Sequence, residues 1–135
     1  MLYQAPHTNI GATTTLSNRG FAASVRVPAA PLDEILDKNE KETCTLIKMD
    51  IEGAEIPVLQ RFVDTFDQYP KRPALAVEAS DNPEWEGLFS RLLALGYQAF
   101  DLHNNYDWLN MAEVAPAQLT AVPKGHTTDI LFLMR

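Results

Sequence analysis

The chain has 135 residues, 46% of them hydrophobic, which suits one compact domain with a core of its own. Its formal net charge is −7, and it has no basic stripe that could neutralise phosphates, so we expect no nucleic-acid partner. No apolar run approaches the roughly 20 residues that span a bilayer, and we expect no membrane span and no secretion signal. The single cysteine, Cys44, fits a packing role in a reducing setting, so we expect a cytoplasmic protein.

The N-terminal part of the chain has weak structural signals. Residues 1–27 are rich in Thr, Ser, Asn and Gly, and predict loops with at most an edge strand. Residues 31–38 predict a short amphipathic helix, because Pro31 suits a first helical turn and apolar residues follow at helical spacing. We therefore expect one domain, 1–135, with an irregular segment, 1–27, and an α/β core, 28–135.

The next segment is an apolar strand, residues 46–50, that runs into a group of acidic residues. Alternation along a strand separates two sets of side chains, Leu46, Lys48, Asp50 and Glu52 on one face and Ile47, Met49 and Ile51 on the other. Parallel strands covered on both faces are usually apolar throughout. The charged face therefore indicates a function or a partner.

The remaining core elements follow from hydrophobic periodicity and turn residues. Helices are predicted over residues 54–66 and 83–96, and strands over 74–79, 97–102 and 129–134. A long polar and aromatic connection, 103–128, separates the last two strands. Alternating helices and strands predict an α/β sheet with parallel strands and helices on both faces. The final strand follows its predecessor without a helix, so we expect it to lie antiparallel beside it.

Ligands of open α/β sheets bind beyond the carboxyl ends of the strands, where this arrangement places Asp50, Glu52 and Glu78. His103 follows the third predicted strand of the core and is a fourth candidate. Clustered carboxylates repel one another, so either one of them keeps a proton or a cation lies among them. That cation is either Lys48 or a divalent metal, for which the sequence offers no dedicated ligand set.

The acidic group has three interpretations. It is a general-base or metal site that deprotonates a substrate hydroxyl, with Asp50 or Glu78 as the base. Alternatively it is structural, with Glu52 and Glu55 interacting with the dipole of the next helix. We favour the structural role for Glu55 and the functional role for Asp50. The third interpretation is a metal-dependent hydrolase, which the small number of histidines disfavours: His7, His103 and His126.

The connection after the third core strand has the composition of an acceptor-binding loop. Its polar and aromatic side chains can donate, accept and stack, and the candidates are His103, Asn104, Tyr106 and Trp108. A surface loop packed by its own aromatic residues is an equally good interpretation. His126 lies in a turn before the last strand, where a solvated residue is the expectation.

Several segments together resemble the FkbM family of methyltransferases. They are Pro31-Leu32-Asp33-Glu34-Ile35, Leu46-Ile47-Lys48-Met49-Asp50-Ile51-Glu52-Gly53-Ala54-Glu55 with Val58-Leu59, Ala76-Val77-Glu78, and Asp129-Ile130-Leu131-Phe132. They occur in the order of the family, and the resemblance spans about residues 9–134. The Asp-x-Glu-Gly-Ala-Glu run is the most specific of these segments.

The resemblance implies a Rossmann-like class I methyltransferase fold, S-adenosylmethionine as methyl donor, and a hydroxyl of a sugar, glycan or secondary metabolite as acceptor. On that template residues 46–50 are the fourth strand, 74–79 the fifth, and the last two strands the sixth and the antiparallel seventh. Asp50, Glu52 and Glu78 then face the transferring methyl group or the acceptor.

The sequence departs from this family at the donor site. Such enzymes hold the donor with an acidic, glycine-rich turn after their first strand, and no apolar strand precedes Asn9-Ile10-Gly11. Between Gly11 and Leu46 there is little room beyond one βαβ unit of roughly 30 residues. The chain therefore resembles the C-terminal half of the fold, and we identify no cofactor-binding residue. We expect association with an N-terminal half or a homo-oligomer. The alternative function is a non-catalytic α/β interaction module that associates through an exposed sheet edge.

Overall fold

The computed structural model describes residues 2–4, 20, 23–51, 53–102, 117–125 and 127–134. Near the N-terminus two short strands, β1 (Leu2–Gln4) and β2 (Ala23–Val25), pair in antiparallel fashion. At most one edge strand was expected in this segment. Composition could not reveal the pairing, because the two strands are distant in sequence and short.

The main sheet has five described strands, β3 (Leu46–Met49), β4 (Ala74–Ala79), β5 (Tyr97–Asp101), β6 (Ala117–Leu119) and β7 (Thr128–Met134). Their order is β3-β4-β7-β5-β6, and β3 is parallel to β4. The final strand β7 is antiparallel to both β4 and β5, between which it lies. The antiparallel orientation of β7 is thus confirmed. The short strand β6 was not predicted, because its three residues carry no clear alternation.

The helices of the core are α1 (Leu32–Ile35), α2 (Lys38–Thr43), α3 (Glu55–Asp64) and α4 (Glu84–Ala94), with a 3₁₀ turn, η3 (Phe66–Gln68). The single helix expected over 31–38 is replaced by two short ones. Asp37 forms a capping box with Glu40: its Oδ1 accepts from the Glu40 N–H at 2.8 Å, and its N–H donates to Glu40 Oε2 at 2.9 Å. A new helix therefore begins at this point.

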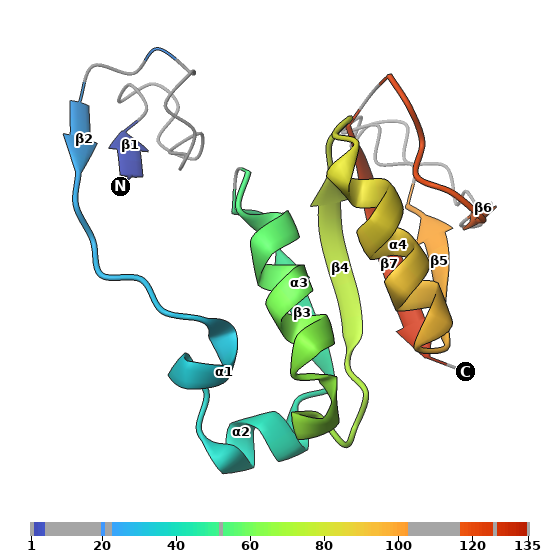
Figure 1. Ribbon diagram of the computed structural model, residues 1–135, viewed down its shortest axis with the longest axis horizontal. Coiled ribbons are helices and arrows are strands. Elements are labelled where there is room, and N and C mark those ends of the chain that lie inside the picture. Colours follow the sequence, from blue (N-terminus) through green and yellow to red (C-terminus); the bar gives the residue numbers. More distant parts are fainter. Residues whose placement is uncertain are drawn as a thin grey trace, which may run out of the picture.

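The two longer helices cover one face of the sheet. Figure 1 shows α3 in front of β3, and α4 in front of β7 with β4 and β5 visible on either side of it. Along β4, Leu75, Val77 and Ala79 are buried beneath them, while the alternate residues are partly exposed. We call the other side the open face; on it Leu46 is 58% and Leu133 38% exposed. The helices expected on both faces are thus found, among the described elements, on one face.

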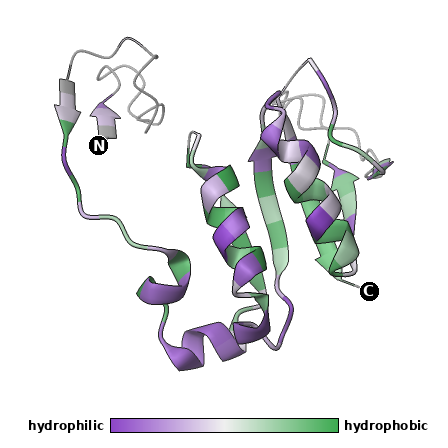
Figure 2. Ribbon diagram, viewed as in Figure 1, coloured by the Kyte–Doolittle hydropathy of each residue, from purple (hydrophilic) through white to green (hydrophobic). Residues whose placement is uncertain are grey.

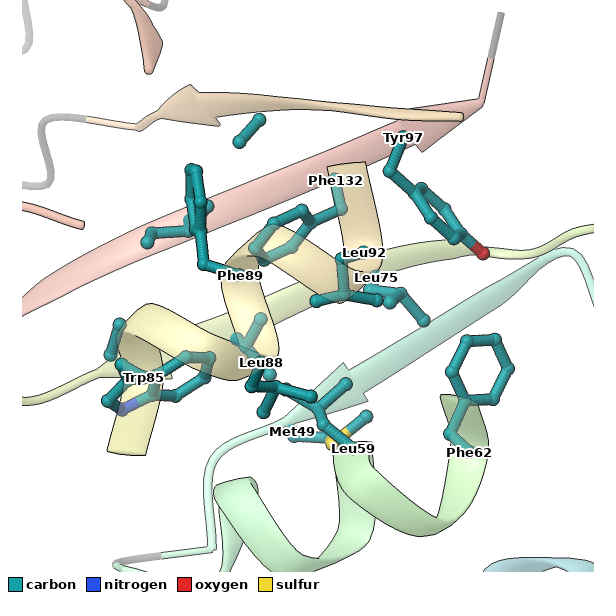
Figure 3. Close-up of a cluster of buried hydrophobic side chains, with 14 of the residues drawn as sticks. Met49, Leu59, Phe62, Leu75, Trp85, Leu88, Phe89, Leu92, Tyr97 and Phe132 are labelled. Atoms are coloured by element: carbon teal, nitrogen blue, oxygen red, sulfur yellow. The ribbon is translucent and has the colours of Figure 1, made fainter. Parts of the chain in front are cut away.

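The core lies between this helical layer and the sheet (Figure 3). The predicted stripe of α4, Trp85, Leu88, Phe89 and Leu92, is fully buried, as are Leu59 and Phe62 of α3. Figure 2 shows the corresponding pattern, with β4 and β7 largely hydrophobic and α2 hydrophilic. Phe89 meets Phe132 of β7 edge to face, with ring centroids 5.6 Å apart. Burial of these side chains fixes how α3 and α4 sit on the sheet.

Two buried tyrosines at the edge of this core have perturbed hydroxyls. Tyr97 donates its hydroxyl proton to the carbonyl oxygen of Pro73 at 2.7 Å, and burial raises the pKa of Tyr97 to about 12. Burial also raises the pKa of Tyr69, whose hydroxyl has no hydrogen-bond partner among the described residues. The fold therefore extends to higher pH the range over which both hydroxyls stay protonated.

We expect the protein to lose stability at alkaline pH because of these tyrosines. The folded state binds the Tyr97 proton more tightly than the unfolded state, in which the pKa is about 10. The free energy of unfolding should therefore stay level up to about pH 9 and fall by roughly 2–3 kcal/mol between about pH 10 and 12. Urea unfolding at a series of pH values measures it. Tyr97→Phe should be less stable at pH 8 but show a shallower alkaline decline; an unchanged slope would contradict this assignment.

Candidate functional site

A cleft of about 310 Å³ lies where β3 and β4 end and β7 begins. It is lined by Lys48, Met49, Asp50, Ala76, Val77, Leu102 and Asp129, and we call it the carboxyl-end cleft. Strand register places Lys48 beside Ala76, and Glu78 opposite Asp129, on the open face. The cleft thus occupies the end of the sheet at which α/β proteins bind ligands.

Lys48 and Asp50, which both line this cleft, form an ion pair. Lys48 Nζ lies 3.2 Å from Asp50 Oδ2, and the two side chains are 69% and 57% exposed. Their placement on the same face agrees with the alternation read from the sequence. An ion pair this exposed contributes little to stability and can be rearranged by a ligand. The carboxylate of Asp50 is therefore accessible from solvent.

Glu55 fixes the loop that follows Asp50. This carboxylate is buried, accepting from the Ile51 N–H at 2.8 Å through Oε1 and from the Gly53 N–H at 2.9 Å through Oε2. Gly53 has a φ of +105°, a conformation that side-chain-bearing residues rarely adopt. The structural role favoured for Glu55 agrees with these contacts, although it acts through two backbone hydrogen bonds rather than through the helix dipole alone.

The structure places only some of the other candidate residues. Glu78 is half-buried on β4, at the same end of the sheet as Asp50. Glu52 of the acidic group lies outside the described residues, and so do all candidates of the long connection and the remaining histidines: His7, His103, Asn104, Tyr106, Trp108 and His126.

Two acidic residues of this region were not singled out from the sequence. Asp129 lines the cleft because β7 returns between β4 and β5, which local sequence patterns do not reveal. Asp101, at the end of β5, is buried, and its Oδ1 accepts from Thr128 Oγ1 at 2.8 Å. The only sequence signal for these two residues was that each is an acidic residue close to an end of a predicted strand.

The described lining of the cleft combines charged side chains, Lys48, Asp50 and Asp129, with apolar ones. Within the described ranges no group of three or more His, Cys, Asp or Glu side chains is arranged to hold a metal ion. Gly53 follows β3, but its N–H already donates to Glu55. This N–H is therefore already engaged within the chain.

The Glu55 contacts can be tested through stability. Glu55→Ala leaves two N–H groups without their charged acceptor, so the free energy of unfolding should fall by about 2–3 kcal/mol. Glu84→Ala is the matched control, since Glu84 is an exposed acid in the first turn of α4 and should change stability by less than about 0.5 kcal/mol. Denaturant unfolding measures both. Equal effects of the two substitutions would show that Glu55 acts only through the helix dipole.

Residues 2–106 match the family model of the methyltransferase FkbM domain, which is more than half of the chain. The searches of curated proteins and of solved structures returned no match. No helix in the described part of the chain is both long and apolar enough to cross a membrane. The five-stranded mixed sheet with its helices agrees with a Rossmann-like methyltransferase fold. The chain therefore belongs to the methyltransferase FkbM domain family.

Proposed function

We propose that this domain takes part in O-methylation, with S-adenosylmethionine as donor and a hydroxyl of a sugar, glycan or secondary metabolite as acceptor. The observation that supports it is the carboxyl-end cleft in a chain of the FkbM family. In this cleft two carboxylates, Asp50 and Asp129, lie beside the apolar side chains of Ala76 and Leu102. Such a mixture of polar and apolar groups is typical of small-molecule sites.

Asp50 is the proposed base of the reaction. Methyl transfer is an in-line displacement, so the protein has to align the two reactants and help remove the hydroxyl proton. The carboxylate of Asp50 accepts that proton, and Lys48, 3.2 Å away, orients it. We also assign Glu78 and Glu52 to this end of the sheet, and assign acceptor binding to His103, Asn104, Tyr106 and Trp108 of the following connection.

Donor binding and turnover test this function. Calorimetry of the chain with S-adenosylmethionine and with its demethylated product measures binding, and labelled donor measures transfer to a panel of sugars. Where transfer is observed, Asp50→Asn should lower turnover by about 10²–10⁴-fold and leave donor affinity unchanged. Asp67→Asn, a substitution on the exposed 3₁₀ turn, should leave both unchanged. Unchanged turnover in Asp50→Asn would remove Asp50 from the mechanism.

We also propose that β3 pairs with a strand from another polypeptide segment. Among the described strands β3 is at the edge of the sheet, although it is parallel to β4 and parallel strands are usually interior. Apolar side chains are exposed on β3 and just after its end: Leu46 and Ile51. An exposed edge with apolar side chains favours the addition of a strand.

The helical layer supports a strand rather than a second copy of the chain. Figure 1 shows α1 beside α3, on the side away from α4 and β4. Arg61 of α3 holds α1 with two hydrogen bonds to Asp33, at 2.8 and 2.7 Å, and this contact lowers the pKa of Asp33. Pairing two β3 edges about a two-fold axis would keep both helical layers on the same face. The α3 helix of the second copy would then collide with α1. A single added strand that carries no helix would cause no such collision.

Hydrogen exchange tests the pairing. A blocked seven-residue peptide of alternating Val and Thr should protect the outward amides of β3, because such residues favour extended pairing. The same peptide with N-methyl groups along one edge is the control and should give no protection. Equal protection by both peptides would contradict backbone pairing. Light scattering of the chain alone should show a monomer; a dimer that shields β3 would favour the second copy instead.

A further inference from the structure

The short helix α1 is attached to the rest of the molecule mainly by polar contacts. None of its four residues, Leu32–Ile35, is buried, and Ile35 is 63% exposed. Leu36, which follows the helix, is partly buried against the core. A helix this short is not stable alone, because its few backbone hydrogen bonds do not offset the cost of starting a helix. Contacts with neighbouring elements therefore keep α1 in place.

Asp33 is the residue through which these polar contacts are made. Its carboxylate accepts from Arg61 Nε at 2.8 Å and from Arg61 Nη2 at 2.7 Å, and its side chain is only 7% exposed. Its carbonyl oxygen accepts from Lys41 Nζ at 2.9 Å, and the same ammonium group donates to Gln68 Oε1 at 2.9 Å. Bidentate contacts between arginine and a carboxylate are stronger and more specific in geometry than ordinary surface ion pairs. We call the contacts of Asp33 with Arg61 and Lys41 the α1 latch.

The residues after α1 form a hinge between this helix and α2. Leu36 ends α1 in an extended conformation, with φ −79° and ψ 133°. Asp37 then begins α2 with the capping box that it forms with Glu40, which uses no residue of α1. Because this capping box satisfies the backbone at the start of α2, α2 does not need α1 to precede it. Opening of the α1 latch would therefore let α1 rotate about Leu36 while α2 keeps its own start.

The position of α1 obstructs contact between two copies of the chain. Figure 1 shows α1 beside α3, on the side away from β4, and α3 lies in front of β3, which is an edge strand among the described strands. Two β3 edges paired about a two-fold axis would place both α3 helices on the same face of the joined sheet, where each would meet α1 of the other copy. Natural proteins often protect an edge strand by covering it with a helix or loop.

We infer that α1 is a releasable guard, which the α1 latch holds beside α3 so that a second copy of the chain cannot pair with β3. With the latch closed, the edge accepts a strand that carries no helix and excludes another copy. With the latch open, α1 moves away and two copies pair in antiparallel fashion through β3. The inference goes beyond methyl transfer and rests on the edge position of β3.

Arg61→Met tests the guard, because it removes both hydrogen bonds to the Asp33 carboxylate and keeps an unbranched side chain. The amides of Glu34, Ile35 and Leu36 donate the backbone hydrogen bonds of α1, and they should exchange with solvent at least about tenfold faster in this variant. Light scattering should show a monomer for the unchanged chain and a concentration-dependent dimer for Arg61→Met. In that dimer the outward amides of β3 should become protected from exchange.

Arg91→Met is the matched control for this substitution. Arg91 forms an ion pair with Asp64 between α4 and α3, and its side chain is 48% exposed, against 46% for Arg61. This variant should stay a monomer with unchanged exchange of the α1 amides. Asp33→Asn is the second test variant. It keeps the shape of the Asp33 side chain, removes its charge, and should give the same dimer as Arg61→Met.

Several results would overturn the inference. A dimer of the unchanged chain that protects β3 would show that α1 does not exclude a second copy. Monomers of both latch variants with fast-exchanging α1 amides would show the same. Unchanged exchange of α1 in both variants would remove the latch, and a dimer that leaves β3 unprotected, or that forms equally in Arg91→Met, would place the contact elsewhere. Failure to bind S-adenosylmethionine would contradict the proposed function and leave this inference in place.

Discussion

Burial of one face of the sheet beneath α3 and α4 is the constraint on which the rest of this structure depends. The apolar stripes of the two helices and the inward residues of β4 and β7 form a single core, centred on residues such as Leu59, Leu92 and Phe132. Because residues alternate along each strand, burying one set directs the other set to the open face. Lys48, Asp50 and Asp129 reach the same cleft for this reason.

At the end of β3, the carboxyl-end cleft lies beside a loop that Glu55 holds by two hydrogen bonds. Glu55 satisfies two backbone N–H groups of the loop, so the chain can turn from β3 into α3 while Asp50 stays on the open face. Two acidic residues of this motif, Glu55 and Asp50, are therefore in different environments. Glu55 is buried and holds the backbone, and Asp50 is exposed and pairs with Lys48.

The uncovered parts of the sheet relate the fold to the proposed function. The described residues line the carboxyl-end cleft, and β3, an edge strand among the described strands, contributes Lys48 and Met49 to it. A strand added at β3 would extend the sheet beneath the helical layer that α1 continues.

Local patterns in the sequence determined most of the core elements, because helical and strand periodicities each depend on neighbouring residues. The strand 74–79, the buried stripe from Trp85 to Leu92, the alternation at Lys48 and Asp50, and the family were all predicted correctly. The break between α1 and α2 was missed, although the Asp37 and Glu40 capping box is a local signal. Only the tertiary structure decided that β7 lies between β4 and β5, that Asp129 enters the cleft, and that the described helices cover one face. These features arise from contacts between residues far apart in the chain, which no local pattern encodes.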